Sequence, residues 1–482
     1  MKNIKKLLEK YPWITYVIGL IPFIAAFIGY AGSGEFSFFQ IVYAALALYF
    51  VNPVVDFEDP YILFAKLAAA VVVAGIILSV LKYAFYKIEH FFIRFNKDAT
   101  VVYTDNELGK MLGKTLKHGY IVTEAKKPEK VQNHILMLSD DAESIKFYSQ
   151  NEKAFYKKNV YMMMNSLDST LLKAADCDGA DLHFFNINDL MARDYWKKNN
   201  LYNNRDDNYK IAIVGYGEIG EAIFKYGYLN NIYSLDQTFE YHIWGCEGSE
   251  ADFIRSLSTE NSDKIVIHEE SWDCSIDCIA GMDRIIYTLE ENQIDFIQKV
   301  LYKNNMASIH FYSRDRICFD EIYNSDNILV FGDMCDILTE DSVKSEKLYR
   351  QGKLFNYDYS LRYGNRKAPS DFEKEMEEEW KKLDGFKKNS SIARADHYWI
   401  EKRLKNDGIM EEDSEDAWKV EHIRWSRFHL INHWKYDKVR DNAHRKHNLL
   451  VPYEELPQSE KEKDGIYDAS IKAEIDKLDR EN

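Results

Sequence analysis

Three long apolar runs dominate the hydropathy pattern at the start of the chain. They are Trp13–Ala31, Phe36–Val55 and Tyr61–Tyr86. The first and third runs are long enough to cross a bilayer as helices, which takes about 20 mostly apolar residues. The middle run has an uninterrupted core of only Ile41–Val51, and a helix that short rises well under the roughly 30 Å of hydrocarbon. The pattern predicts a membrane segment over residues 1–97.

The basic residues around these runs predict which side of the membrane each end faces. Four lysines precede the first run, and four basic residues from Lys82 to Lys97 lie at or after the end of the third. Basic flanks stay in the cytoplasm, so both ends lie inside and the number of crossings is even. The middle run is then a re-entrant helix, which needs protein or a water-filled cavity around it. Three plain crossings that anchor a sensor remain the alternative interpretation.

An acidic loop follows the middle run and carries Asp56, Glu58 and Asp59. Around the axis of an oligomer these carboxylates would form a ring that attracts cations, so they are candidate pore residues. The order of helix, short inner helix, acidic loop and helix resembles the two-helix pore unit of potassium channels. The Thr-Val-Gly-Tyr-Gly filter signature is absent, because residues 51–56 read Val-Asn-Pro-Val-Val-Asp. Potassium selectivity is therefore not expected.

Strands and helices alternate between Ala99 and about Asn200. The expected strands are Thr100–Thr104, Tyr120–Glu124, His134–Ser139, Asn159–Met164 and Leu182–Phe185. Such alternation predicts a parallel sheet covered on both faces, and we assign it to an α/β domain over residues 98–202. The turn after the first strand reads Thr-Asp-Asn-Glu-Leu-Gly. It lacks a glycine fingerprint and places two acids where a pyrophosphate would lie, so this domain is not expected to bind a nucleotide.

A second α/β domain is expected over residues 209–345, and its first strand ends in a glycine motif. The strand Lys210–Val214 is followed by Gly215, Gly217 and Gly220, and then by a helical segment. Gly215 permits the tight turn, Gly217 lets the backbone approach a phosphate, and Gly220 lets the helix pack closely on the strand. The helix N-terminus adds amides and the positive end of a dipole. This order is the pattern of a dinucleotide-binding turn.

Two acidic residues complete the candidate cofactor site. Glu218 lies inside the glycine motif, and the ribose-binding acid of this pattern normally ends the second strand. That strand here ends Trp-Gly-Cys-Glu, so the displaced Glu247 is the candidate. Further strands are expected at Tyr241–Trp244, Lys264–His268, Arg284–Tyr287, Ser308–Tyr312 and Ile328–Phe331. The motif predicts NAD or another nucleotide as cofactor, and a glycine turn kept only for packing is the alternative.

Two such domains behind a membrane hairpin resemble the cytoplasmic regulator-of-potassium-conductance family, whose NAD-binding domains are of the TrkA N-terminal type. The resemblance covers about Ala99–Thr339. It rests on the three glycines of the motif and on segments 180–181 and 190–193, which close the first repeat. In that family the domains pair through helices and turn ligand binding into mechanical force on the pore helices. The resemblance therefore implies a membrane protein regulated from the cytoplasm.

Composition narrows the range of functions. The net charge of the 482-residue chain is −16, which argues against nucleic acid as a partner, because binding a phosphate backbone needs a basic surface. The six cysteines all follow the membrane segment and none forms a Cys-x-x-Cys pair. We therefore expect reduced thiols in a cytoplasm and no metal site. Metalloprotease, Walker and nucleophile-elbow motifs are absent from the sequence, so an enzyme is not expected.

Three segments near the C-terminus carry the most specific motif of the chain. They are Asn389–His397, Glu421–Trp425 and Leu450–Asp464. With them, residues 346–482 look like a bacterial version of the ryanodine-receptor repeat domain. One departure is that His433 and Asp437 stand where the family commonly has glycines, which affects the turn geometry expected there.

The residue types of this domain indicate a ligand-binding cleft. Tryptophan and tyrosine offer stacking faces, while arginine and lysine donate hydrogen bonds to anions. The candidate ligand-binding residues are Arg424, Trp425, Trp434, Tyr436, Arg440 and Lys461. The combination suits a nucleotide-like or ADP-ribose-like ligand. The alternative is that the tryptophans belong to the core and the charges pair internally.

These observations predict a multi-domain fold: an α-helical transmembrane segment, two α/β Rossmann-like parallel-sheet domains and a mainly α-helical C-terminal ryanodine-receptor repeat domain. We expect an oligomeric effector or ion channel, most simply a tetramer, gated by a small nucleotide-like ligand. It would lie in the lipid of the inner (plasma) membrane of a bacterium, with its soluble domains in the cytoplasm. The C-terminal resemblance implies sensing of nucleotide-derived signals, including in anti-phage defence. A membrane-anchored NAD-dependent enzyme and a non-conducting anchored sensor or scaffold are the alternatives.

Overall fold

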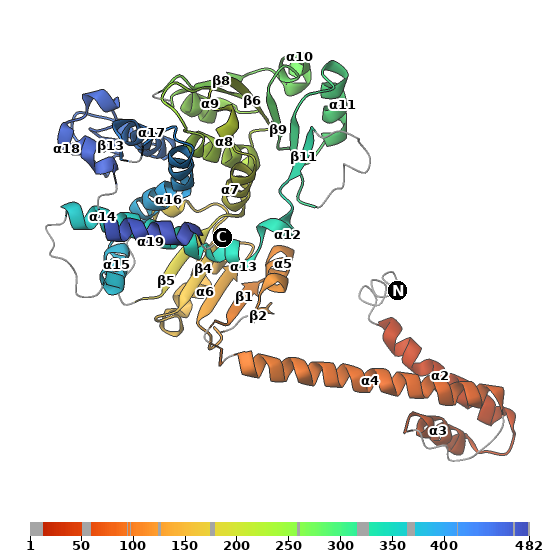
Figure 1. Ribbon diagram of the computed structural model, residues 1–482. Helices are drawn as coiled ribbons and strands as arrows, with labels where there is room; N and C mark the ends of the chain where they lie inside the picture. The colour runs from red at the N-terminus through yellow and green to blue at the C-terminus, as the bar shows by residue number, and fades with distance from the viewer. Residues whose placement is uncertain are drawn as a thin grey trace. The chain divides into compact units, whose positions relative to one another are not determined.

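The computed structural model of the protein describes two compact units, Met1–Phe95 and Asn96–Asn482. The residues described are 13–50, 59–93, 95–96, 98–123, 127–173, 179–257, 261–315, 327–363, 372–411, 413–465 and 468–480. The first unit is helical, and the second contains both sheets and the C-terminal helices (Figure 1).

The first unit pairs two long helices and sets a short helix beside them (Figure 1). Its elements are α2 (Trp13–Gly32), α3 (Phe38–Ala47), the 3₁₀ turn η1 (Leu48–Phe50) and α4 (Pro60–Ile93). Within the described part of the chain, one stretch, Pro60–Phe85, is long and apolar enough to cross a membrane, with a mean hydropathy of 2.5. The apolar stretches of α2 and of α3 with η1 are shorter.

Small side chains let these three helices approach closely. Alanines from all of them fill the buried core of the unit: Ala25, Ala26, Ala44, Ala45, Ala65 and Ala69. Gly29 of α2 lies against Ile62 of α4, where an added Cβ atom would come within 2.6 Å of the isoleucine side chain. Small residues at helix contacts are typical of helices that associate in lipid, where apolar burial gives no driving force between them.

The first sheet of the second unit has five parallel strands, as the strand–helix alternation predicts. They are β1 (Thr100–Thr104), β2 (Gly119–Val122), β3 (Asn133–Met137), β4 (Asn159–Met163) and β5 (Asp181–Phe185). Their order is β2-β1-β3-β4-β5. Strands β1 and β3 are buried along their whole length, as expected of a sheet covered on both faces. The parallel α/β fold of this segment is confirmed.

The second sheet has six parallel strands. They are β6 (Asn208–Val214), β7 (Thr238–Trp244), β8 (Lys264–His268), β9 (Arg284–Tyr287), β10 (Ile309–Tyr312) and β11 (Ile328–Phe331). Their order is β11-β10-β9-β6-β7-β8, which is the 3-2-1-4-5-6 order of a Rossmann fold when the strands are counted from β6. The order reverses between β6 and β9, and open α/β sheets bind ligands at such reversals.

Helices connect the strands and form the C-terminal part of this unit (Figure 1). Those between and after the strands are α5 (Glu107–Thr115), α6 (Asp141–Gln150), α7 (Ile187–Lys198), α8 (Glu218–Asn230), α9 (Gly248–Arg255), α10 (Ile276–Ile279), α11 (Gln293–Lys303), α12 (Met334–Ile337) and α13 (Glu340–Lys344). The C-terminal elements are α14 (Glu346–Tyr363), α15 (Phe372–Lys381), α16 (Gly385–Asn406), α17 (Glu415–Ile431), β12 (Lys435–Tyr436), β13 (Lys446–His447), α18 (Gln458–Lys461) and α19 (Ala469–Arg480).

One hydrophobic core joins the parts of the second unit. It includes Ile135 of the first sheet, Ile213 of the second sheet and Phe428 of α17. The two α/β parts and the C-terminal helices therefore bury apolar surface against one another.

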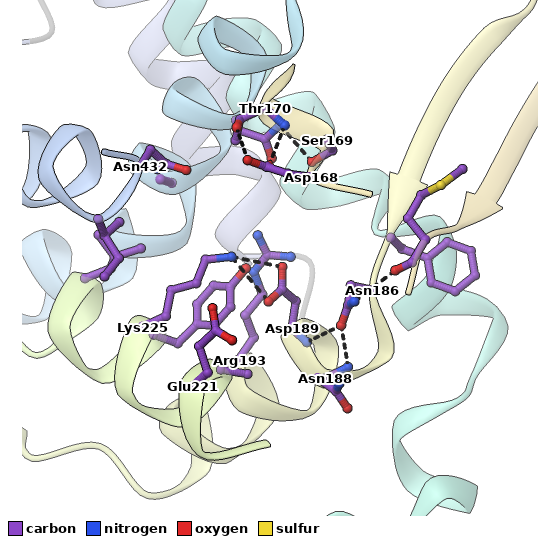
Figure 2. A pocket seen from close by; sticks show the side chains of 18 of the residues that line it. Asp168, Ser169, Thr170, Asn186, Asn188, Asp189, Arg193, Glu221, Lys225 and Asn432 are labelled. Atoms are coloured by element: carbon purple, nitrogen blue, oxygen red, sulfur yellow. Dashed lines mark hydrogen bonds and ion pairs between the residues drawn. The ribbon is translucent and has the colours of Figure 1, made fainter. Parts of the chain in front are cut away.

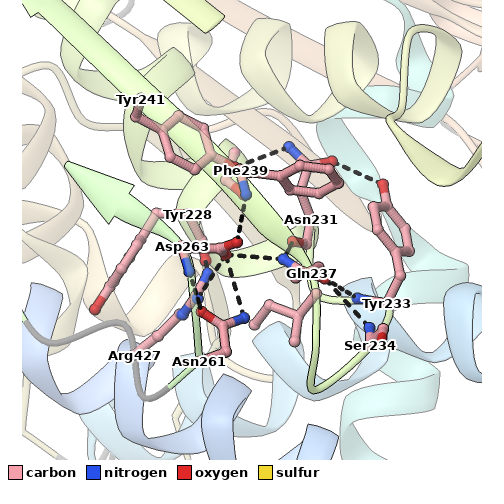
Figure 3. A network of polar contacts seen from close by, with 12 residues as sticks. Tyr228, Asn231, Tyr233, Ser234, Gln237, Phe239, Tyr241, Asn261, Asp263 and Arg427 are labelled. Atoms are coloured by element: carbon pink, nitrogen blue, oxygen red, sulfur yellow. Dashed lines mark hydrogen bonds and ion pairs between the residues drawn. The ribbon is translucent and has the colours of Figure 1, made fainter. Parts of the chain in front are cut away.

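A buried polar network also attaches α17 to the second α/β part (Figure 3). Arg427 of α17 donates to the Asp263 carboxylate at 2.8 Å, to the Tyr228 backbone carbonyl at 2.9 Å and to the Asn261 side chain at 3.0 Å. The side chains of Arg427 and Asp263 are fully buried. Removing one partner of a buried ion pair leaves an unpaired buried charge and strongly destabilises the folded protein. The folded state therefore favours the position of α17 in which this pair forms.

Candidate ligand-binding cleft

A cavity of about 1140 Å³ lies between helices α14 to α17 and the segment that follows α17. We call it the aromatic cleft. Its aromatic and imidazole lining consists of Phe355, Tyr359, Tyr363, Phe386, His422, Trp425, His429, Trp434 and His447. Its cationic lining consists of Lys173, Lys382, Lys387, Arg394, Arg424, Arg440, Arg445 and Lys463. Its acidic lining consists of Glu379, Asp384, Glu421, Glu460 and Asp464, and three of these pair with lining lysines. The cleft thus combines ring faces with cationic donors, which are the residue types predicted, and with carboxyl groups that offset part of their charge.

The aromatic wall of the cleft is built on one face of α17. Trp425 and His429 are four residues apart and therefore neighbours on the helix surface, with ring centroids 4.0 Å apart. His447 meets the edge of Trp425 at 5.0 Å, and Trp434 lies 5.0 Å from Phe386. Trp425 remains partly exposed, while Trp434 is 8% exposed. Trp425 therefore retains surface on which a planar ligand can stack.

The imidazoles in this wall are uncharged at neutral pH. Burial lowers the pKa of His429 to about 3 and that of His447 to about 4. The wall therefore offers apolar ring faces, and the positive charge of the cleft comes from its arginines and lysines.

Arg424 forms the buried floor of the cleft. Its Nε and Nη2 atoms donate to the two carboxylate oxygens of Glu421, each at 2.7 Å, and the residue is only 2% exposed. Its Nη1 atom is buried and has no hydrogen-bond partner among the described residues, and the same is true of Trp434 Nε1. A buried donor without a partner costs about 1–3 kcal/mol, and an acceptor group of a ligand would remove that cost.

A largely but not fully buried carboxyl group, Asp464, lies beside this floor, with its side chain 16% exposed. Burial and the negative charge of Glu421 raise the pKa of Asp464 to about 8, although Arg394 and Arg424 oppose the shift. The Asp464 backbone carbonyl accepts a hydrogen bond from Arg394 at 2.6 Å. At neutral pH the carboxyl group is therefore mostly protonated and does not neutralise the arginines.

Asp464 gives the stability of the second unit a pH dependence. An unfolded aspartate has a pKa of about 3.9, so the folded state binds the extra proton between that value and about 8. The contribution of Asp464 to the free energy of unfolding is therefore fully present below about pH 4 and is lost as the pH rises to about 8. Between pH 6.5 and 8, we expect the free energy of unfolding to fall by up to about 1.4 kcal/mol per pH unit more in the wild type than in Asp464→Asn.

Denaturant unfolding at a series of pH values measures this difference. Below pH 6.5 the buried histidines have the opposite effect on stability. His429 and His447 stay unprotonated in the folded state, whereas the unfolded chain binds these protons. Their contribution to the free energy of unfolding therefore falls as the pH falls. Equal slopes for the wild type and Asp464→Asn between pH 6.5 and 8 would contradict the assignment.

The structure brings together four of the six predicted ligand-binding residues. Arg424, Trp425, Trp434 and Arg440 line the aromatic cleft, whereas Tyr436 and Lys461 do not. Tyr436 is 52% exposed on β12, and Lys461 lies over the ring of Tyr453 at 4.7 Å.

Several lining residues were not predicted from the sequence. Of these, Arg394 lies in one of the three motif segments, and His429 follows Trp425 by one helical turn. Membership of that motif segment was the signal for Arg394, and helical spacing from Trp425 was the signal for His429. Phe386 comes from the start of α16, and nothing in the local pattern connects it with α17.

The glycine motif after β6 forms a tight turn from the strand into α8. Gly215 has a φ of +100°, which favours glycine. A Cβ atom on Gly220 would lie 2.0 Å from the Gly215 carbonyl oxygen, while a Cβ on Gly217 would meet nothing within 4 Å. Gly217 is also the N-cap of α8. The first and third glycines are therefore required by the turn, and the second faces open space.

The charges at this turn oppose a pyrophosphate. Glu218 and Glu221 lie in the first turn of α8, and Glu250 lies in the first turn of α9. Burial and the neighbouring Glu250 raise the pKa of Glu221, which is the effect of crowded carboxylates. The predicted ribose ligand Glu247 is exposed at the N-cap of α9. The glycines fit a dinucleotide, whereas the carboxylates repel its phosphates, so nucleotide binding here stays a prediction.

Of the predicted pore residues, Asp59 lies within the described part of the chain, while Asp56 and Glu58 lie outside it. The Asp59 carboxylate accepts hydrogen bonds from the backbone N–H groups of Tyr61 and Ile62 at 2.8 and 3.2 Å. Asp59 therefore caps the N-terminus of α4, a role that stabilises a helix by about 1 kcal/mol.

A second cavity, of about 800 Å³, lies where the ends of β4 and β5 meet helices α7, α8, α16 and α17. Figure 2 shows Lys225, Asp189 and Arg193 directed toward one another inside it. Lys225 pairs with Asp189 at 3.3 Å, and Arg193 donates to Asp396 of α16 at 2.7 Å. The sequence did not predict this cavity, because its walls come from segments distant along the chain.

Comparison with protein families identifies one segment of the chain. Residues 409–472 match the family model of the RyR domain. The match covers α17, β12, β13 and α18. It includes Arg424 and the Trp425, His429, Trp434 and His447 rings of the cleft, whereas Phe386 lies outside it. The predicted ryanodine-receptor repeat is confirmed over this segment. A search of curated proteins found no match.

Proposed function

We propose that this protein is a ligand-gated membrane effector whose aromatic cleft binds a nucleotide-like or ADP-ribose-like anion. The observation that carries the proposal is the floor of the cleft, where Arg424 keeps a buried Nη1 donor without a partner in the described chain, in a cavity that Trp425 also lines. Guanidinium groups bind phosphate oxygens, and exposed aromatic faces stack on bases. The cleft volume of about 1140 Å³ is ample for a small ligand.

Helix α17 connects the aromatic cleft with the second α/β part, so it is the proposed route by which ligand binding changes that part. It carries Arg424 and Trp425 toward the cleft, and one turn later Arg427 is fixed to Asp263 in the second α/β part. The following residue, Phe428, lines the second cavity. A ligand that shifts α17 would therefore alter the packing of the α/β part, provided that it binds two arrangements of these elements with different affinity.

The first unit supports a membrane role for the other end of the chain. Many large apolar side chains of α4 are more than half exposed in it: Tyr61, Leu63, Phe64, Leu67, Val71, Ile76, Ile77, Leu78, Val80, Tyr83 and Phe85. A helix that is apolar all round fits a bilayer. One hairpin cannot enclose a pore, so we propose a homo-oligomer, most simply a tetramer, in a bacterial plasma membrane with the second unit in the cytoplasm.

A second candidate function is nucleotide binding at the glycine turn, including by an NAD-dependent enzyme. The open space at Gly217 and the Rossmann strand order favour it. Hydride transfer that is detected with a nicotinamide cofactor and lost in Gly217→Asp would support this candidate over the effector.

Ion flux from liposomes tests the proposed effector. Full-length protein in vesicles loaded with a fluorescent ion indicator is expected to leak ions only when ADP-ribose or a related nucleotide is added on the side of the second unit. Trp425→Ala, which removes a stacking face of the cleft, should raise the ligand concentration needed for the response by about five- to 150-fold. A nucleotide that binds without changing the permeability would contradict gating.

A further inference from the structure

A cluster of three side chains behind the floor of the aromatic cleft has the composition of a metal site. His397 and Glu401 lie four residues apart on α16 and so share one helix face, and Glu421 faces them from α17. Each offers one ligand atom, and these atoms all lie within 4.8 Å of one another. The cluster is distinct from the cysteines, which were the residues considered for metal binding in the sequence.

The hydrogen bonding of His397 leaves a ring nitrogen available as a ligand. Its Nε2 atom lies 3.0 Å from the backbone carbonyl of Ile232, and because a carbonyl only accepts, Nε2 carries the proton. The Nδ1 lone pair then points toward Glu401, whose Oε1 atom is 3.7 Å away. This is the arrangement of a metal-binding histidine, in which the second nitrogen is held by a carbonyl or carboxylate.

Two buried acceptors therefore face one another without a donor between them. His397 is 0% exposed, and neither its Nδ1 atom nor Glu401 Oε1 has a hydrogen-bond partner within the described ranges. Buried polar atoms are nearly always satisfied, and an unsatisfied pair calls for a missing water or ion. A cation satisfies both acceptors at once, which a third acceptor such as Glu421 cannot do.

We propose that His397, Glu401 and Glu421 bind one divalent zinc-class cation that ties α16 to α17. Imidazole nitrogens and carboxylate oxygens are both zinc ligands, with bonds of about 2.0–2.2 Å. In a tetrahedral site two such bonds hold their ligand atoms about 3.3–3.6 Å apart. The ligand atoms of the cluster lie within 4.8 Å of one another, so any pair closes by at most about 1.5 Å when the ion binds. A water molecule or a ligand atom would complete four-coordination.

The carboxylates of Glu401 and Glu421 supply two negative charges for a divalent ion, and Glu421 shares its charge with Arg424 and Arg394. The carboxylates of Glu421 and Glu401 already face Arg424 and Arg394, so a divalent ion adds positive charge to the floor of the cleft. The carboxyl group of Asp464 lies close enough to both arginines to be influenced by their charges. Its ionisation would offset one unit of positive charge at the floor of the cleft. The remaining charge favours an anion in the cleft, although zinc binding itself does not depend on the proposed ligand.

Metal analysis of the full-length protein in detergent tests the site. After chelator treatment and dialysis, titration with zinc is expected to load one ion per chain in the wild type. Glu401→Gln keeps the side-chain shape and should weaken zinc binding at least tenfold, as should His397→Gln. His444→Gln is the matched control, because His444 forms an exposed pair with Asp441, and it should bind zinc like the wild type.

Two results would overturn the proposal. The first is a wild-type protein that takes up no zinc, which would mean that a proton or water satisfies the two acceptors. The second is zinc uptake that is unchanged in Glu401→Gln and His397→Gln. If either variant fails to fold, X-ray absorption of zinc-loaded wild type decides. One imidazole with oxygen ligands is expected, and sulfur ligands would assign the metal to cysteines and refute the site.

Discussion

Replacing Arg427 by methionine is expected to lower the free energy of unfolding of the second unit by about 3–5 kcal/mol. The substitution leaves the Asp263 carboxylate fully buried without its guanidinium partner. It also removes the hydrogen bond to the Tyr228 carbonyl. Chemical denaturation of the full-length protein, followed by tryptophan fluorescence, measures the loss.

Arg255→Met is the matched control for this prediction. Arg255 forms exposed ion pairs with Asp252 and Glu269, and exposed pairs contribute only about 0–1 kcal/mol. A loss of less than 1 kcal/mol in Arg427→Met would show that the buried pair does not hold α17 in place. The double variant Arg427→Met with Asp263→Leu should recover part of the stability, because it removes the unpaired charge.

Gly220→Ala is expected to destabilise the second unit far more than Gly217→Ala. A Cβ atom at position 220 would lie 2.0 Å from the backbone oxygen of Gly215, and a backbone atom cannot move aside as a flexible side chain can. Forcing an atom into a packed contact costs about 1–3 kcal/mol or more. Gly217 has a φ of −102° and open space around it, so alanine there should cost under about 1 kcal/mol.

Thermal unfolding of the two variants gives the comparison. Equal losses would mean that the turn has relaxed away from the close contact between Gly215 and Gly220. A loss of nucleotide affinity in Gly217→Ala with no loss of stability would favour the second candidate function, because only a ligand reaches the space in front of that glycine.

The sheets were predictable because their signals are local. Each parallel strand is a short apolar run between turn residues, and the glycine motif directly follows β6. The RyR segment was predictable for a related reason, since two of its three motif segments lie close together between Glu421 and Asp464. The predicted cleft also depended on residue types that occur together within this segment.

The features that the sequence did not reveal join distant segments. Arg427 meets Asp263 across 164 positions, and Arg193 meets Asp396 across 203. Neither pair has a periodicity that marks it, because each residue alone fits an ordinary charged helix or loop. The same reason explains why Tyr436 and Lys461 were grouped with the cleft, since proximity in sequence does not fix which way a side chain points.

Equilibrium binding of nucleotides to the full-length protein tests the central claim most directly. Isothermal titration with ADP-ribose, NAD and related nucleotides should find at least one ligand, and Trp425→Ala should weaken it by about 1–3 kcal/mol, the usual value of one base–aromatic stack. Tyr436→Ala, an exposed aromatic residue outside the cavity, should bind like the wild type. Absence of binding across the panel, or equal weakening by the two substitutions, would contradict a ligand site in the aromatic cleft.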